Sequence, residues 1–260
     1  MPGLSHALST GMAVLTLGTT AFTPSAPAFA TSAMKAPSSA RAAEAVRAAE
    51  WQQLPGLASR LAAGPTTLWS INRSGAVQRW TGSGWALEGG QASRISVSTD
   101  DSLPWILRSN GTIWRRTSAG AWQQVTGTGA DIAAGGTDNT WVLGNAGAIF
   151  RWNGSGWTRA DGSAARIAAG SRGEAWITDP SRRVYRRSSN QWQQMPGGDV
   201  LDIAVAGPTR VAITTADHDA YLWTGSDWQQ LPGVAAAGIA IDNQHVYALD
   251  PNGKIWKLYA

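Results

Sequence analysis

The 260-residue chain has a formal net charge of +4, and only 15% of its residues are charged, while it contains 30 glycines, 15 tryptophans and no cysteine. Because its 18 arginines and 3 lysines are scattered along the sequence, the excess charge is a diffuse field, and we expect no nucleic-acid partner. The absence of cysteine excludes a disulfide framework and a lipidated cysteine anchor, so stability has to come from the apolar core.

Residues 1–30 have the features of a secretory signal peptide. An apolar segment at 11–22 is followed by Ala28-Phe29-Ala30, which fits the small-x-small cleavage rule. A membrane-spanning helix needs about 20 apolar residues, and here Thr, Gly, Ser and Pro interrupt the segment, so we expect no membrane insertion. Residues 31–50 are rich in Ala and are predicted to be a linker. The chain is therefore predicted to be secreted or periplasmic.

The rest of the chain repeats itself. Tryptophans that begin equivalent segments recur at intervals of 34, 37, 35, 35 and 36 residues, at Trp51, Trp85, Trp122, Trp157, Trp192 and Trp228. Each unit contains four short apolar pieces bounded by Gly, Asn, Asp or Ser, and no helical pattern interrupts them. A repeat of four short strands is typical of a propeller blade. We predict an all-β, six-bladed β-propeller over 51–260.

The four strands of each blade can be assigned in order. The innermost strands are expected at 58–64, 93–98, 130–135, 165–170, 201–207 and 237–242, where small side chains fit the crowded axis. The leading residue of each second strand is predicted to be Trp69, Trp105, Trp141, Trp176, Val211 or Val246. A hairpin then leads to the third strand, and its last turn residue is Gly75, Gly111, Gly147, Arg182, His218 or Gly253. Glycine at four of these six positions indicates a turn that needs positive φ.

The two ends of the repeat region complement each other. The sixth unit lacks a fourth strand, whereas WQQLP at 51–55 is a fourth strand with no blade before it. Pairing 51–55 with the C-terminal strand would complete the last blade and remove an open sheet edge. We therefore predict that the N-terminal strand closes the ring.

The connections between third and fourth strands alternate. Blades 1, 3 and 5 carry tryptophan on both sides of a short turn, as the pairs Trp80 and Trp85, Trp152 and Trp157, and Trp223 and Trp228. In blades 2 and 4, Arg116 and Arg187 replace the first tryptophan. These eight residues are the candidate ligand contacts, because indole faces suit sugar rings and guanidinium groups bind hydroxyls or anions. The alternatives are packing between blades for the tryptophans and solvation at the surface for the arginines.

The repeated W-Q-Q-[LVM] opening, the IAAG strand, the second-strand Trp and the N-x-x-G hairpin resemble the tectonin family, whose members include fungal tectonins, horseshoe-crab tachylectin and fish-egg lectins. The resemblance covers 51–260. Blades 5 and 6 depart from it by lacking the second-strand Trp. It implies a six-bladed propeller that binds surface glycans, with lipopolysaccharide and O-methylated sugars among the ligand classes.

Catalysis finds little support in the sequence. His218 and His245 lie outside any nucleophile, metal or acid–base motif, and no phosphate loop or calcium loop is present. We therefore expect neither an enzyme nor a cofactor or metal. The leading hypothesis is a monomeric, multivalent lectin, and the alternative is a protein-interaction scaffold that does not depend on glycans.

Overall fold

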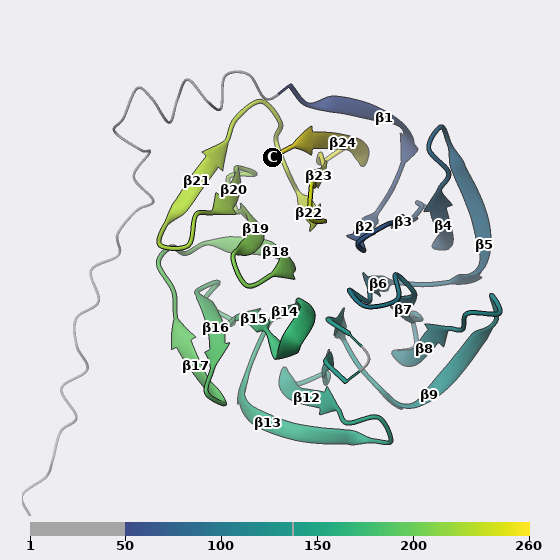
Figure 1. The fold of residues 1–260 in the computed structure, drawn as a ribbon, viewed down its shortest axis with the longest axis vertical. Helices are drawn as coiled ribbons and strands as arrows, with labels where there is room; N and C mark the ends of the chain where they lie inside the picture. Colours follow the sequence, from purple (N-terminus) through teal and green to yellow (C-terminus); the bar gives the residue numbers. More distant parts are fainter. Residues whose placement is uncertain (1–49, 137) are drawn as a thin grey trace, which may run out of the picture. The chain divides into compact units, whose positions relative to one another are not determined.

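The computed structural model describes residues 50–136 and 138–260, so the predicted signal peptide and all but the last residue of the predicted linker lie outside it. The described residues form six four-stranded antiparallel sheets arranged as a ring (Figure 1). The predicted six-bladed propeller is confirmed.

The blades are numbered along the chain, and each strand is given with its bounds. Blade 1 consists of β2 (Arg60–Ala63), β3 (Leu68–Ile71), β4 (Ala76–Trp80) and β5 (Trp85–Gln91). Blade 2 consists of β6 (Arg94–Val97), β7 (Pro104–Leu107), β8 (Thr112–Arg116) and β9 (Trp122–Thr128). Blade 3 consists of β10 (Asp131–Ala134), β11 (Thr140–Leu143), β12 (Ala148–Trp152) and β13 (Trp157–Ser163).

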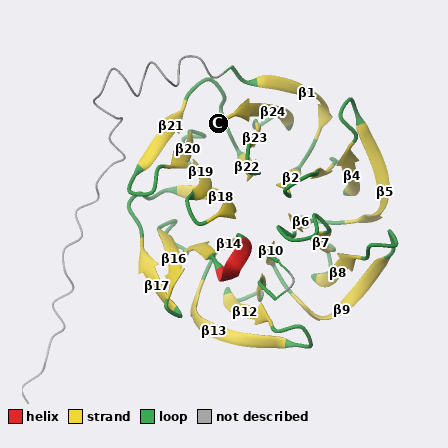
Figure 2. Cartoon of the chain, viewed as in Figure 1, coloured by secondary structure: helices red, strands yellow, loops and turns green. Residues whose placement is uncertain are grey.

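Blade 4 consists of β14 (Arg166–Ala169), β15 (Ala175–Thr178), β16 (Val184–Ser188) and β17 (Gln191–Gln194). Blade 5 consists of β18 (Val200–Gly207), β19 (Arg210–Thr215), β20 (Ala220–Trp223) and β21 (Trp228–Leu231). Blade 6 consists of β22 (Gly238–Ile241), β23 (His245–Leu249), β24 (Lys254–Tyr259) and β1 (Gln52–Leu57). A short 3-10 helix, η1 (Ser171–Gly173), follows β14 (Figure 2).

The ring closes as the sequence predicts. β1, from the start of the described chain, lies beside β24 at its end (Figure 1), and Gln53 pairs with Trp256 in an antiparallel register. Leu54 of β1 is only 6% exposed and packs in a cluster with Ile255. The closure therefore contributes apolar burial as well as backbone hydrogen bonds.

All six predicted hairpin positions have positive φ, including Arg182 at 62° and His218 at 65°, where no glycine is present. Their carbonyl oxygens form a second set of contacts. Each accepts a hydrogen bond from a main-chain N–H just before or at the start of the inner strand of the next blade, as Gly147 does from Ala164 at 2.9 Å. The turn conformation thus also links successive blades, which explains why non-glycine residues are held in the left-handed region.

The predicted leading residues of the second strands are correct in blades 1 to 4 and wrong in blades 5 and 6. The four tryptophans are buried, and in blade 1 Trp69 pairs with Ala62 of the inner strand. The residues in the equivalent register are Ala212, opposite Ala204, and Tyr247, opposite Ala240. The predicted Val211 and Val246 are one residue out, and a shift of one residue places a side chain on the other face of the sheet.

Candidate functional site

Each outermost strand is fastened to the preceding blade by a tryptophan. The indole N–H donates a hydrogen bond to a main-chain carbonyl of the preceding outer strand or the turn that follows it. The pairs are Trp51 with Pro232, Trp85 with Pro55, Trp122 with Gly89, Trp157 with Thr126, Trp192 with Asp161 and Trp228 with Pro196, at 2.7 to 3.2 Å. We call these six contacts the tryptophan belt. The candidate ligand residues Trp85, Trp157 and Trp228 thus use their only polar group between blades.

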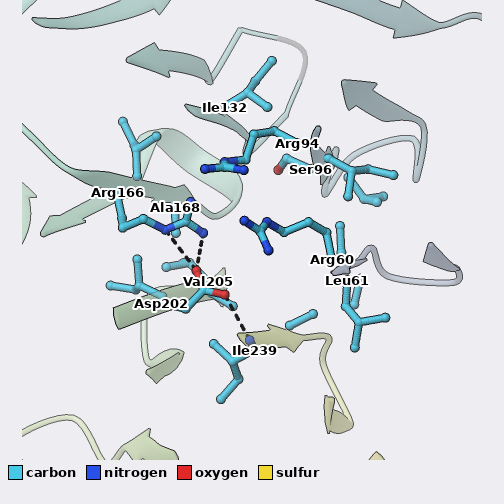
Figure 3. A pocket seen from close by; sticks show the side chains of 18 of the residues that line it. Arg60, Leu61, Arg94, Ser96, Ile132, Arg166, Ala168, Asp202, Val205 and Ile239 are labelled. Carbon is cyan, nitrogen blue, oxygen red and sulfur yellow. Dashed lines mark hydrogen bonds and ion pairs between the residues drawn. The ribbon is translucent and has the colours of Figure 1, made fainter. Parts of the chain in front are cut away.

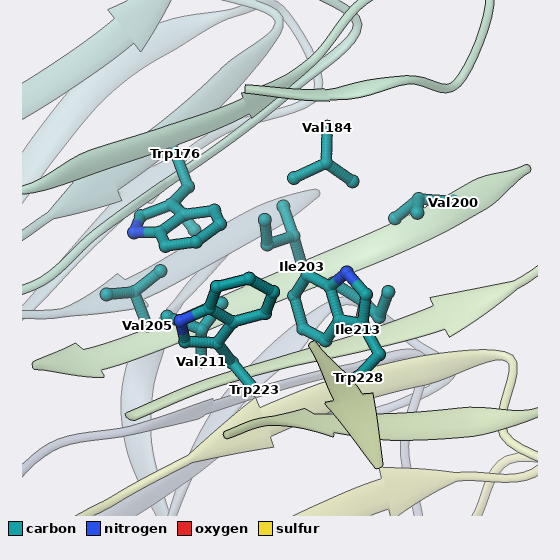
Figure 4. Packing of buried hydrophobic residues seen from close by; sticks show 10 residues of the cluster. Trp176, Val184, Val200, Ile203, Val205, Val211, Ile213, Trp223 and Trp228 are labelled. Atoms are coloured by element: carbon teal, nitrogen blue, oxygen red, sulfur yellow. The ribbon is translucent and has the colours of Figure 1, made fainter. Parts of the chain in front are cut away.

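Two of the other candidate tryptophans are buried between blades. Trp223 is 4% exposed and lies between Trp176 of blade 4 and Trp228 of its own blade, with ring centroids 5.9 and 5.0 Å away (Figure 4). Trp152 is 7% exposed and is placed in the same way between Trp105 and Trp157. The structure therefore places both side chains in the packing between blades, and their ligand role stays a prediction.

In blades 2 and 4, the two candidate arginines occupy the position that Trp152 and Trp223 occupy in blades 3 and 5. Arg116 lies between the rings of Trp69 and Trp122, 5.7 and 5.3 Å from their centroids, and forms an ion pair with Glu88 of blade 1. Arg187 lies between Trp141 and Trp192 at 5.4 and 5.0 Å. Neither is the solvated surface arginine that the sequence also allowed, because cation–π contacts hold both between indoles. Burial lowers the pKa of Arg187, and the charge of the exposed Asp161 offsets this lowering only in part.

The interface between blades 6 and 1 is built differently. Tyr247 occupies the register position that the second-strand Trp occupies in blades 1 to 4. Trp80 of blade 1, at the position that corresponds to Arg116 and Arg187, is partly exposed. Trp80 packs edge-on against Trp85, with the ring centroids 5.2 Å apart. A cleft of about 550 Å³ opens here, lined by the β2–β3 turn, the start of β3, the end of β4 and the turn after it in blade 1, and by the β22–β23 turn and β23 of blade 6. Trp80, one of the predicted tryptophans, lines this cleft.

The blade 6 wall of this cleft is a preorganised turn. The Asp242 carboxylate accepts main-chain hydrogen bonds from Gln244 and His245 and a third from the Tyr247 hydroxyl at 2.9 Å. Burial and the neighbouring Asp242 charge raise the pKa of Tyr247, so the hydroxyl remains a donor. With its backbone fixed, the turn presents the exposed side chains of Asn243 and Gln244 at the cleft.

The opposite wall supplies hydroxyl groups and one cation. Thr66 and Thr81 are exposed at the cleft, and Arg79 is held by an ion pair with Glu88 at 2.7 Å. Amides and hydroxyls both donate and accept hydrogen bonds, as the hydroxyls of a sugar require. An aromatic edge with such groups around it suits a neutral polyhydroxylated ligand.

Four residues of the blade 6 wall were not predicted from the sequence: Asp242, Asn243, Gln244 and Tyr247. One signal was available, because blade 6 departs from the repeat at its second-strand aromatic position. Among residues 50–136 and 138–260, no cluster of three or more His, Asp or Glu side chains is placed to hold a metal ion. In the same residues, no helix is long and apolar enough to cross a membrane.

The comparisons with known proteins agree on the architecture. A family model described as the Tectonin domain matches residues 33–130 and 128–212. No curated protein sequence matches the chain.

Several solved structures resemble the fold at low identity. The RRP9 WD40 repeats match with a TM-score of 0.61 and 10% identity over 81% of this chain and 97% of that one. Yeast RCC1 (Prp20) in complex with Kap60 matches with 0.54 and 13% over 76% and 68%. YCF48 bound to a D1 peptide matches with 0.54 and 17% over 82% and 96%. At such identities the likeness extends to the fold alone.

Proposed function

Because the chain belongs to the Tectonin domain family, we propose that it is a carbohydrate-binding protein that holds a neutral glycan in the cleft between blades 6 and 1. The observation that carries this proposal is Trp80, a partly exposed indole in an open cleft with uncommitted amides opposite it. A sugar C–H face packs on such a ring, while Asn243 and Gln244 satisfy its hydroxyls.

The cleft is preorganised, which favours binding. The Asp242 cap fixes the backbone that presents both amides, and Trp85 supports the Trp80 ring. Little conformational entropy is then lost when a sugar binds, and rigid aromatic contacts give area at low entropic cost. We place the first site here because Trp152 and Trp223 are buried at their own interfaces.

We propose further that the protein is exported and meets its ligand outside the cytoplasm. The apolar segment at 11–22 and the Ala-x-Ala sequence at 28–30 support this proposal. Surface polysaccharides, lipopolysaccharide and O-methylated sugars are the ligand classes to test first.

A glycan array with the full chain tests the proposal. It should include methylated sugars and bacterial polysaccharides, and each hit should be competed with the free sugar. Specific binding that free sugar displaces, and that Trp80→Ala weakens without loss of folding, is the expected result. A blank array from folded protein would contradict the proposal.

The alternative function is a protein-interaction scaffold. One similar structure holds a peptide, so the fold can accommodate a protein ligand. In that case a partner would be captured by the chain, and free sugar would not displace it.

A further inference from the structure

A ring of charged residues lines one end of the central channel. On each inner strand, one residue pairs with the aromatic residue of the second strand, or with Ala212 in blade 5. The ring residue lies two positions before that residue in the sequence. In order from blade 1 to blade 6 these residues are Arg60, Arg94, Asp131, Arg166, Asp202 and Gly238. The residues of blades 2 to 5, Arg94, Asp131, Arg166 and Asp202, alternate in charge.

The alternating part of the ring is neutralised internally. The Arg166 guanidinium lies 3.1 Å from an Asp131 oxygen and also forms an ion pair with Asp202 (Figure 3), while Arg94 lies 3.5 Å from Asp131. Burial opposes the charge of Arg166, but the two carboxylates outweigh it and raise the pKa of this guanidinium. Both aspartates also accept a main-chain hydrogen bond from the next blade, Asp131 from Ile167 and Asp202 from Ile239.

Arg60 is left out of this arrangement. Its neighbours in the ring are Arg94 and Gly238, so blade 6 supplies no carboxylate where blades 3 and 5 supply one. Its guanidinium points toward the channel axis (Figure 3), donates to its own neighbour Ser59 O at 2.7 Å, and buries an Nε that has no partner among the described residues. Burial and the charges of Arg94 and Arg166 lower its pKa, and the carboxylates of Asp202 and Asp131 offset this lowering only in part. A partly buried cation without an ion-pair partner of its own is costly.

The channel widens beside Arg60 into a mouth of about 380 Å³. The charged residues that line it are Arg60, Arg73, Arg94, Arg166, Asp202 and Asp250. The Asp250 carboxylate is occupied by main-chain N–H groups of its own turn, those of Asn252 and Lys254, and Asp202 is occupied by Arg166. The mouth therefore carries excess positive charge with a free guanidinium edge, and the channel beyond it, about 70 Å³, admits only a small group.

We propose that this mouth is an anion-binding site that takes the carboxylate of a small acidic ligand of about the size of one hexuronic acid, with Arg60 as the principal partner. A planar carboxylate matches the donor fork of a guanidinium and would supply the negative charge that Gly238 omits. A single carboxylate balances the one unpaired arginine of the ring. The site is separate from the cleft between blades 6 and 1, so it does not depend on the glycan proposal.

Calorimetric titration of the full chain in low-salt buffer without phosphate or sulfate tests the proposal, with glucuronate, acetate and methyl glucoside as probes. We expect glucuronate and acetate to bind and the neutral methyl glucoside to produce no heat at this site. No binding of glucuronate, or binding of methyl glucoside that Arg60→Gln weakens as much as it weakens glucuronate binding, would overturn the proposal.

Variants locate the site. Arg60→Gln should weaken glucuronate binding at least tenfold, whereas Arg159→Gln removes an equal charge from the exposed face of β13 and should leave binding unchanged. Trp80→Ala should also leave it unchanged, which separates this site from the glycan cleft. Undiminished binding by Arg60→Gln would overturn the assignment.

Gly238→Asp provides an independent measurement. A Cβ at this position would meet Asp202 Oδ2 at 3.5 Å and Leu249 Cβ at 3.6 Å, which are ordinary contacts, so the position accommodates a Cβ. A carboxylate here should pair with Arg60 and abolish the stabilisation by glucuronate that we expect for the wild type. If Gly238→Asp does not fold, the Arg60→Gln titration decides alone.

Discussion

The indole N–H of Trp228 donates a 2.8 Å hydrogen bond to the carbonyl of Pro196, one blade earlier in the ring. The same relationship recurs at all six interfaces, so the tryptophan that marks the repeat in the sequence is also the residue that joins consecutive outer strands. In a propeller without disulfides, these contacts link the outer strands of neighbouring blades and stabilise the ring in addition to its apolar core.

The belt can be tested with two tryptophans of one stack. Trp228 and Trp223 are 6% and 4% exposed and touch each other, but the structure gives an interblade hydrogen bond to Trp228 alone. Trp228→Phe should therefore cost about 1 to 2 kcal/mol more than Trp223→Phe, because it also leaves the Pro196 carbonyl unpaired. Urea unfolding measures the difference, and equal losses would contradict the role of the belt.

Replacing Arg116 or Arg187 by methionine should destabilise the fold to different extents. Arg116→Met and Arg187→Met both retain an unbranched side chain between two indoles and both lose a cation–π contact. Only Arg116→Met also leaves Glu88 without one of its two arginine partners. We expect Arg116→Met to be more destabilising by about 1 to 2 kcal/mol in thermal unfolding. Equal effects would indicate that the ion pair contributes nothing.

The closure of the ring predicts a large effect near the start of the repeat region. Leu54 of β1 corresponds to Val125 of β9, and both are buried. Leu54→Ala should cost about 2 to 4 kcal/mol, as in a core strand, and Val125→Ala provides the comparison inside a continuous blade. A cost below about 0.5 kcal/mol, the size of a surface substitution, would show that β1 does not stabilise the ring.

Alkaline unfolding tests the surroundings of Tyr247. Its pKa is raised in the folded state by burial and by Asp242, so the stability it contributes is fully present below the unfolded pKa of about 10 and is lost as the pH rises above that value. Between about pH 10 and 12 the wild type should lose up to ~1.4 kcal/mol per pH unit through this group. Tyr247→Phe should flatten this slope, and an unchanged slope in that variant would contradict the prediction.

Much of this architecture follows from local patterns. The Trp period gives six blades, the incomplete sixth unit gives the closure, and the turn pattern gives positive φ even at Arg182 and His218. These features depend on residues close in sequence or on a repeat, which a single chain displays directly.

The remaining features depend on register. Tyr247 was missed because blade 6 is offset by one residue from the position that the repeat suggests. The charged ring was missed because Asp131 and Arg166 lie on different blades, and their pairing emerges only once the inner strands are aligned around the axis. The belt was missed because its acceptors are main-chain carbonyls, which carry no sequence signal.

The most direct test of the proposed function is a calorimetric titration of the best array glycan into the wild type, Trp80→Ala, Asn243→Ala and Leu87→Ala, the last replacing a 70% exposed residue that does not line the cleft. We predict that the first two variants lose at least tenfold in affinity, about 1.4 kcal/mol, while Leu87→Ala binds like the wild type and all three unfold cooperatively. Undiminished glycan affinity in both Trp80→Ala and Asn243→Ala would contradict the assignment of the cleft between blades 6 and 1.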